Sequence, residues 1–162
     1  MTDAVMEEIR RAQEMNLGGD RAGARATLER LWETADDALH RCTIAHYLAD
    51  LQGSVEDELR WDELALREFP GLTDERAREY DATWQARAFL PSLHLNLADV
   101  HRRAGNRGRA RHHLTEAVAA LDALPADDYG AMIRDALDEV REAIDTGSTA
   151  PLRPASQAQK KP

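Results

Sequence analysis

The sequence is poor in cysteine and in aromatic residues, and it has no long apolar run. Cys42 is the one cysteine among 162 residues, and aromatic residues make up 5% of them. A single cysteine excludes an internal disulfide and a cysteine-rich zinc site. No apolar run approaches the roughly 20 residues of a membrane-spanning helix, and the opening MTDAVMEEIRR lacks the apolar core of a signal peptide. We therefore expect a cytoplasmic protein without a membrane segment.

Catalytic signatures are also missing. The chain has no glycine-rich phosphate loop, no GxSxG motif and no HExxH motif. We therefore expect no enzymatic activity and no cofactor.

The residues that are abundant favour helices and an acidic surface. Hydrophobic residues make up 43% of the chain and charged residues 31%, and the apolar residues are mainly Ala and Leu. Ala, Leu, Glu and Arg lose little side-chain freedom in a helix, so the composition predicts an all-α protein. The net charge of -9 repels phosphate backbones and argues against a nucleic-acid partner.

A helix hairpin is predicted around Gly105, in the stretch LADVHRRAGNRGRARHHLTEAV. Gly105 can take the left-handed conformation that ends a helix, and Asn106 can cap the next helix. Apolar residues lie at helical spacing on both sides of the glycine. They are Leu93, Leu97, Val100 and Ala104 before it, and Ala110, Leu114, Ala117 and Leu121 after it.

This hairpin pattern recurs twice nearer the N-terminus. Gly19 in NLGGDRAGARATLERL is followed by Ala24 and Leu28 at the offsets that separate Gly105 from Ala110 and Leu114. A weaker copy surrounds Gly53, where Ser54 and Asp57 form a helix-capping pair. The pattern resembles tetratricopeptide repeats, whose 34-residue units are helix hairpins, and the whole chain is similar to short repeat proteins of actinobacteria.

The resemblance implies an α-solenoid of about three helix hairpins. The repeats fall at about 5–38, 39–72 and 91–124, and Leu97 and Ala98 take packing positions of the first helix in the last repeat. An unbroken apolar stripe predicts one extended helix over about 73–104, kinked at Pro91. The alternative is two shorter helices that meet at residues 89–91. After Pro125, a terminal amphipathic helix is expected to cap the stack. We expect one domain over residues 1–146 and a disordered tail over 147–162.

The function implied by this class of scaffold is the binding of a protein or peptide in the groove lined by the first helices of the repeats. Asn96 matches a position that holds the ligand backbone in peptide-clamping members. Ser92 and Asp99 stand where those members carry lysines, so recognition of a C-terminal carboxylate is not expected. Tyr47, Asp50 and Asp99 share the predicted surface with Asn96 and suit a basic or amphipathic partner.

The alternative function is a small-molecule or peptide sensor with a closed pocket. Its candidate residues are polar groups within largely apolar helices, namely Arg41, His46, His94, Asn96 and Arg134. The end face of so short a stack can also support homo-oligomers.

Histidines and arginines are the remaining candidates for a ligand site. His94 and His101 lie seven residues apart on one predicted helix face, and a metal there needs a further ligand such as His46 or Asp50. Packing or surface roles are favoured, and no metal is expected. His112 and His113, with Glu116, are interpreted as surface residues. Arginines at 102, 103, 107, 109 and 111 form a basic cluster that can complement a helix C-terminus or anchor an acidic group.

Overall fold

The computed structural model describes residues 2–152, and the regular structure within this range is entirely helical. The chain divides into two compact units, which are treated separately: unit 1 runs to Leu72, and unit 2 is Thr73–Leu152. Unit 1 contains α1 (Ala4–Leu17), α2 (Arg21–Thr34), α3 (Ala38–Ala49), α4 (Val55–Glu68) and the 3-10 helix η1 (Phe69–Gly71). Unit 2 contains α5 (Asp74–Tyr80), η2 (Ala86–Phe89), α6 (Leu90–Arg103), α7 (Arg107–Ala119), η3 (Leu121–Ala123) and α8 (Asp128–Thr146). The all-α prediction is confirmed for the described range.

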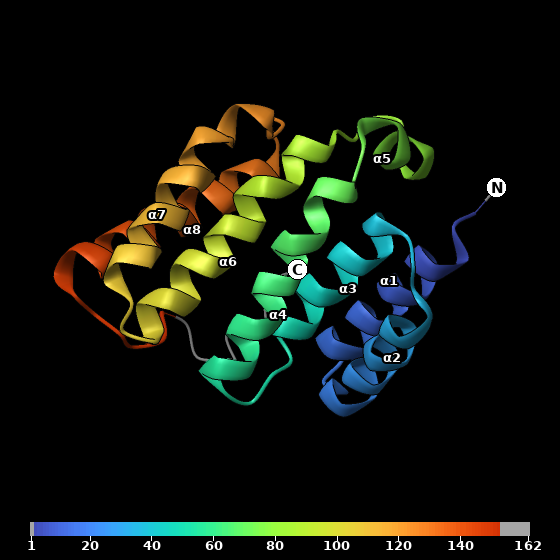
Figure 1. Cartoon of the computed structure of the whole chain (residues 1–162), viewed down its shortest axis with the longest axis horizontal. Helices are drawn as coiled ribbons and strands as arrows, with labels where there is room; N and C mark the ends of the chain where they lie inside the picture. Colours follow the sequence, from blue (N-terminus) through green and yellow to red (C-terminus); the bar gives the residue numbers. More distant parts are fainter. Residues whose placement is uncertain (1, 153–162) are drawn as a thin grey trace. The chain divides into compact units, whose positions relative to one another are not determined.

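Two hairpins, α1–α2 and α6–α7, turn in the same way (Figure 1). Gly19 and Gly105 have φ of 96° and 83°, which confirms the left-handed conformation predicted for Gly105. After each glycine, a backbone N–H reaches back five residues: Asp20 donates to the Met15 carbonyl at 2.9 Å, and Asn106 to the His101 carbonyl at 2.8 Å. These bonds satisfy helix-end carbonyls, and the positive φ explains why glycine stands at both turns.

The helix caps after these two turns differ. Asn106 occupies the N-cap position of α7, as predicted, but its side chain makes no capping hydrogen bond. At the equivalent place in the first hairpin, the Asp20 carboxylate accepts the backbone N–H of Gly23 at 2.9 Å. The α7 start therefore lacks a stabilising contact that the α2 start has.

Small residues sit where the two helices of each hairpin pack. Ala12 and Ala24 of the first hairpin are fully buried, and so are Ala98 and Ala110 of the later one. Ala98 and Ala110 belong to one core cluster, which α8 completes with Val140 and Ile144. A methyl side chain lets two helix backbones approach closely, and alanines are fully buried at the corresponding places of both hairpins.

The α3–α4 hairpin has a different turn. Gly53 is not among the glycines with positive φ, and the chain turns through Leu51 and Gln52, which donate to the carbonyls of Leu48 and Ala49. The predicted capping pair is confirmed: the Ser54 hydroxyl accepts the Asp57 backbone N–H at 3.1 Å. The weaker sequence match at Gly53 thus corresponds to a helix hairpin without the glycine-centred turn.

The predicted extended helix over 73–104 is wrong. Thr73 caps α5 as expected, accepting the Arg76 backbone N–H at 3.1 Å, but α5 ends at Tyr80. The Asp81 carboxylate then accepts the backbone N–H of Thr83 at 2.9 Å and its hydroxyl at 2.6 Å. Short polar side chains that bond nearby backbone groups compete with helix formation, which accounts for the break.

Helix α6 begins close to the junction given by the two-helix alternative. Leu90 is its first residue, so Pro91 lies in the first turn and is fully buried. A proline is tolerated there because the first N–H groups of a helix have no intrahelical acceptor. Before it, the Asp74 carboxylate accepts the Ala86 backbone N–H at 2.8 Å and ties η2 to the start of α5.

Helix α8 packs along α6 and α7 (Figure 1), as expected for a terminal amphipathic helix. Asp127 caps it by accepting the Gly130 N–H at 2.9 Å, and Gly147 ends it with φ of 75°. Its buried stripe is Ile133, Leu137, Val140 and Ile144. Most of the predicted disordered tail, residues 153–162, lies outside the described residues. In the described part of the chain, no helix is both long and apolar enough to span a bilayer.

Candidate functional site

Three buried histidines of unit 2 form a row, here called the histidine stack: His94, His101 and His113. They are 8%, 3% and 9% exposed. His94 and His101 are seven residues apart on α6, a rise of about 10.5 Å along the helix. The His113 ring from α7 lies between them, with its centroid 5.2 Å from that of His94 and 5.4 Å from that of His101.

The His94 and His113 rings meet edge to edge. Their Nδ1 atoms are 3.0 Å apart, whereas the ring centroids are 5.2 Å apart with an interplanar angle of 28°. These values leave little lateral offset, so the two Nδ1 atoms point at each other. One of them must therefore carry the proton and the other must accept it.

A metal ion does not fit between these two nitrogens. Two nitrogens bound to one tetrahedral zinc at about 2.0–2.1 Å lie about 3.3 Å apart with their lone pairs converging on the metal, whereas these nitrogens are 3.0 Å apart and point at each other. Within residues 2–152, no group of three or more His, Cys, Asp or Glu side chains is arranged to hold a metal. The distance between the two Nδ1 atoms is that of a hydrogen bond, so a single proton is shared between them.

Burial and neighbouring cations disfavour charge on this pair. Burial, followed by the nearby His94, His101, His112 and Arg109, lowers the pKa of His113 from 6.5 to about 4. The pKa of His94 is also lowered, by burial first and by His112, although Glu116 opposes the shift. Both imidazoles are therefore neutral at neutral pH.

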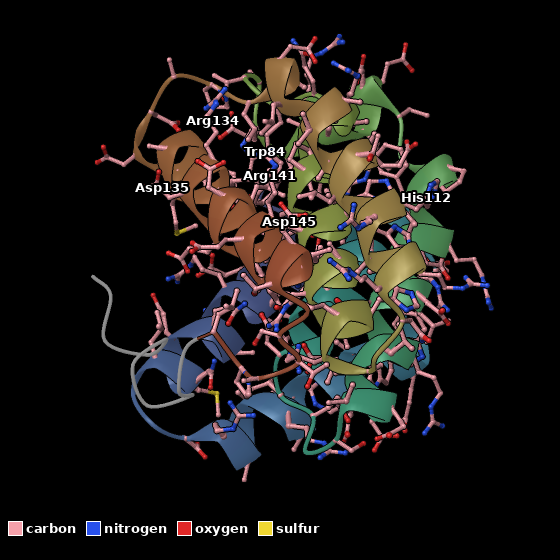
Figure 2. The ribbon with its side chains drawn as sticks, turned by 90° about the vertical axis from the view of Figure 1, so that its left-hand side faces the viewer. Trp84, His112, Arg134, Asp135, Arg141 and Asp145 are labelled. Atoms are coloured by element: carbon pink, nitrogen blue, oxygen red, sulfur yellow. The ribbon has the colours of Figure 1, made fainter. Side chains whose placement is uncertain are left out.

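The sequence grouped these histidines differently. It placed His94 and His101 on one face correctly, but it assigned His113 to the surface with His112 and Glu116. The structure buries His113 and leaves His112 and Glu116 exposed, with His112 directed away from α8 (Figure 2). The signal for His113 was its place on the apolar stripe, between Ala110 and Ala117 at helical spacing.

The basic cluster is used within unit 2. Arg102, with its side chain 2% exposed, bonds Asp99 at 2.6 Å and the carbonyls of Ser148 and Ala150 at 2.8 Å each. Arg103 also bonds Asp99, at 2.8 Å. These contacts fix the segment after α8 against the end of α6. Asp99, predicted to face a ligand, thus has both carboxylate oxygens engaged by arginines of its own helix.

Two other arginines of the cluster bond the end of α8. Arg107 donates to the Asp145 carbonyl at 2.8 Å, and Arg111 pairs with its carboxylate at 3.3 Å. Cations stabilise the negative end of a helix dipole, so the predicted role of the cluster at a helix C-terminus accounts for Arg107 and Arg111.

Four predicted binding residues lie in unit 1, three of them on α3 and Asp50 directly after it. Arg41 pairs with Glu68 at 3.0 Å, donates to the Ala35 carbonyl at 3.0 Å and stacks 3.8 Å over the Trp32 ring. Burial lowers the pKa of His46 to about 4, and its ring lies 5.5 Å from that of Tyr47. Asp50, at the end of α3, is exposed, and its carbonyl accepts from Arg21.

The other predicted binding residues lie in unit 2. Asn96 is half-buried on α6, and Arg134 of α8 donates to the Leu121 carbonyl at 3.2 Å. Of the eight predicted residues, His94 is the one that belongs to the histidine stack. Arg41, Asp99 and Arg134 are bound to groups of their own unit.

The outer face of α8 carries a feature that the sequence reading missed. Tyr129 and Met132, three residues apart, are 46% and 43% exposed. The helix bears six carboxylates and two guanidinium groups, and Asp135 lies on its outward side (Figure 2). Helical spacing gave a signal for Met132, which lies outside the buried stripe, but not for Tyr129, which lies four residues before Ile133 and continues that stripe.

Searches with family models, among curated proteins and among solved structures found no match to this chain. Its function is therefore inferred from the geometry of the described residues.

Proposed function

We propose that the protein is a non-catalytic adaptor that binds a basic, amphipathic helical segment of a partner protein on the outer face of α8. The observation that carries this proposal is the exposed pair Tyr129 and Met132 on a strongly acidic helix. Tyr and Met are enriched at protein interfaces, and Met adapts to varied apolar partners. Carboxylates around such a pair favour cationic residues in the partner.

The hairpin architecture supports the adaptor reading and the resemblance to tetratricopeptide repeats. The turn at Gly19 recurs at Gly105, and the buried pair Ala12 and Ala24 recurs as Ala98 and Ala110. All these equivalent positions are 86 residues apart. We infer that the hairpins are repeats of one unit, which stack as a short solenoid capped by α8.

The proposed surface differs from the groove expected on α6. All residues of α6 are buried or half-buried, and Asp99 is held by Arg102 and Arg103. A ligand that binds Asp99 must first break its two ion pairs, which costs free energy. A ligand that binds the exposed side chains Tyr129 and Met132 of α8 does not incur this cost. The groove contacts expected at Tyr47, Asp50 and Asn96 stay a prediction.

The test is a titration of the ¹⁵N-labelled protein with a synthetic Leu/Lys peptide patterned as an amphipathic helix. We expect amide shifts concentrated on α8, and binding that weakens as salt rises, because exposed charges are screened. The same peptide with Glu in place of Lys should not bind.

Two variants locate the contact. Tyr129→Ala with Met132→Ala should weaken peptide binding at least tenfold and leave thermal stability within about 0.5 kcal/mol, because both side chains are exposed. The matched control is Leu17→Ala in α1, which removes a side chain that is 58% exposed. Equal binding by the double variant and the wild type would refute the α8 surface.

A further inference from the structure

We propose that His94 and His113 form a one-proton site, in which His94 donates its Nδ1–H to Nδ1 of His113, accepts one additional proton at Nε2, and excludes protonation of His113 while the hairpin stays closed. The site is independent of the α8 surface. It makes the α6–α7 hairpin sensitive to acid.

The proton count follows from the facing nitrogens. In the neutral pair, His94 carries a proton on Nδ1 and His113 carries one on Nε2, so the 3.0 Å contact is a donor–acceptor pair. A proton from solvent can add to Nε2 of His94 without disturbing this contact. A further proton on Nδ1 of His113 would set two N–H donors against each other, and the contact would break.

The surrounding charges select His94 as the donor. Beyond the effect of burial, Glu116 raises the pKa of His94 more than His112 lowers it, whereas the neighbours that act on His113 are all basic and lower its pKa: His94, His101, His112 and Arg109. A carboxylate near one ring and cations around the other separate their affinities for a proton. The positive form of the pair is therefore His94 protonated and His113 neutral.

The other elements packed on α6 do not change this assignment. α8 faces α6 and α7 with an apolar stripe that includes Leu137 and Val140. From η2, Arg87 donates to Asp122 and to the Ala119 carbonyl at 2.8 Å each, so its charge is directed to those groups.

The sign of the pH dependence follows from burial. The pKa of His113 falls from 6.5 to about 4 in the folded chain, so between these values the unfolded chain binds more protons. Stability that is fully present above pH 6.5 is lost as the pH falls toward about 4. The pair is tightly coupled, so the two protons are taken up in steps that belong to the pair.

The first test is the tautomer of each ring at pH 7.5, read from long-range ¹H–¹⁵N NMR correlations of the full chain. We expect the Nδ1–H form for His94 and the Nε2–H form for His113. The opposite assignment would overturn the choice of donor, and the Nε2–H form for both rings would overturn the shared-proton contact.

The second test counts protons during unfolding. His113→Asn presents an amide oxygen to the His94 donor but cannot titrate. The slope of log K for unfolding against pH, between pH 6.5 and 4, should fall by about one proton relative to the wild type. His112→Asn, which changes an exposed neighbour in the same cluster, should leave the slope unchanged. An unchanged slope in His113→Asn would refute the proposal.

A second variant, His94→Asn, keeps the test possible if His113→Asn does not fold. His94→Asn replaces the Nδ1–H donor by an amide whose oxygen can accept a hydrogen bond, so His113 can take a proton while the chain is folded. The slope should therefore also fall, by up to one proton. If neither this variant nor His113→Asn differs from the wild type, the pair is not the acid-sensitive group.

Discussion

Arg102 is expected to be a major contributor to the stability of unit 2. Its guanidinium bonds one carboxylate oxygen of Asp99 and two backbone carbonyls, those of Ser148 and Ala150. The side chain is only 2% exposed. In Arg102→Met the stem is kept, but the charged group and its four hydrogen bonds are lost.

The magnitude can be estimated from what remains after the change. Breaking a buried ion pair by removing one partner costs about 3–5 kcal/mol. Here Asp99 keeps Arg103 at 2.8 Å, and the Ala150 segment is exposed and can bond water instead. Both effects reduce the loss, so we expect Arg102→Met to lower the free energy of unfolding by about 2–3 kcal/mol.

The assay is urea unfolding followed by Trp84 fluorescence. Trp84 is the tryptophan of unit 2, and Trp32→Phe with Trp61→Phe provides a background in which the signal reports this unit alone. Every variant is compared within that background.

Two further substitutions separate the bonding geometry from the charge. Arg102→Lys keeps the charge but not the planar fork, so it should recover only part of the loss. Arg141→Met, which removes an exposed pair with Asp138, is the matched control and should cost less than about 0.5 kcal/mol. A loss in Arg102→Met no larger than in Arg141→Met would refute the role given to the buried guanidinium.

Further predictions concern four backbone and core positions. Gly105→Ala should destabilise the protein by about 1–2 kcal/mol because its φ is 83°, and Gly105→Pro should unfold the hairpin. Gly108→Ala, at a helical position with open space for a methyl group, should stabilise by up to about 1 kcal/mol in the same urea series; the reverse order would contradict the turn assignment. Gly130→Ala should lower the melting temperature despite alanine's helix propensity, because its Cβ would lie 2.2 Å from the Pro125 carbonyl oxygen; an unchanged melting temperature would show that this approach relaxes freely. Burial raises the pKa of the Cys42 thiol to about 12, so alkylation at pH 8 should be slow in the native protein and fast in urea; equal rates would mean that the thiol is accessible.

The helices bounded by local signals could be predicted from the sequence. Glycine at the turns of α1–α2 and α6–α7, and short polar caps such as Ser54 and Thr73, act within a few residues of where they stand. A fixed backbone requirement links each residue to its conformation, so the prediction needs no knowledge of the tertiary structure.

The segment before α6 could not be predicted because its apolar spacing is shared by a helix and by a packed turn. Tyr80, Trp84 and Ala88 keep helical phase, yet the backbone between them is not a continuous helix. The ring of Trp84 instead contacts those of Tyr80 and Phe89, with centroids 5.0 and 5.4 Å apart. Asp81 ends α5 by bonding the backbone of Thr83. Periodicity reports which residues are buried, but here the local bond of Asp81 decided the backbone path.

Among the candidate site residues, some features also follow from local sequence and others depend on tertiary contacts. The exposure of Met132 follows from helical phase, whereas Tyr129 lies four residues before Ile133, continues the buried stripe by spacing, and is nevertheless exposed in the first turn of α8. Contacts such as those of Arg102 with Ser148 and Ala150 join residues more than 40 positions apart. No local pattern encodes such contacts, because they depend on the docking of α8 against α6.

The histidine stack lies between these two cases. The turn at Gly105 sets the register of α6 against α7, and the same turn at Gly19 sets that of α1 against α2. The repeat offset maps His94, His101 and His113 onto Glu8, Met15 and Thr27, which are half-buried in the first hairpin. The shared turn therefore makes all three places interfacial, and the choice of residue determines the chemistry. Histidine at all three brings two facing nitrogens into a partly dry contact, where burial rather than sequence neighbours sets the proton affinity.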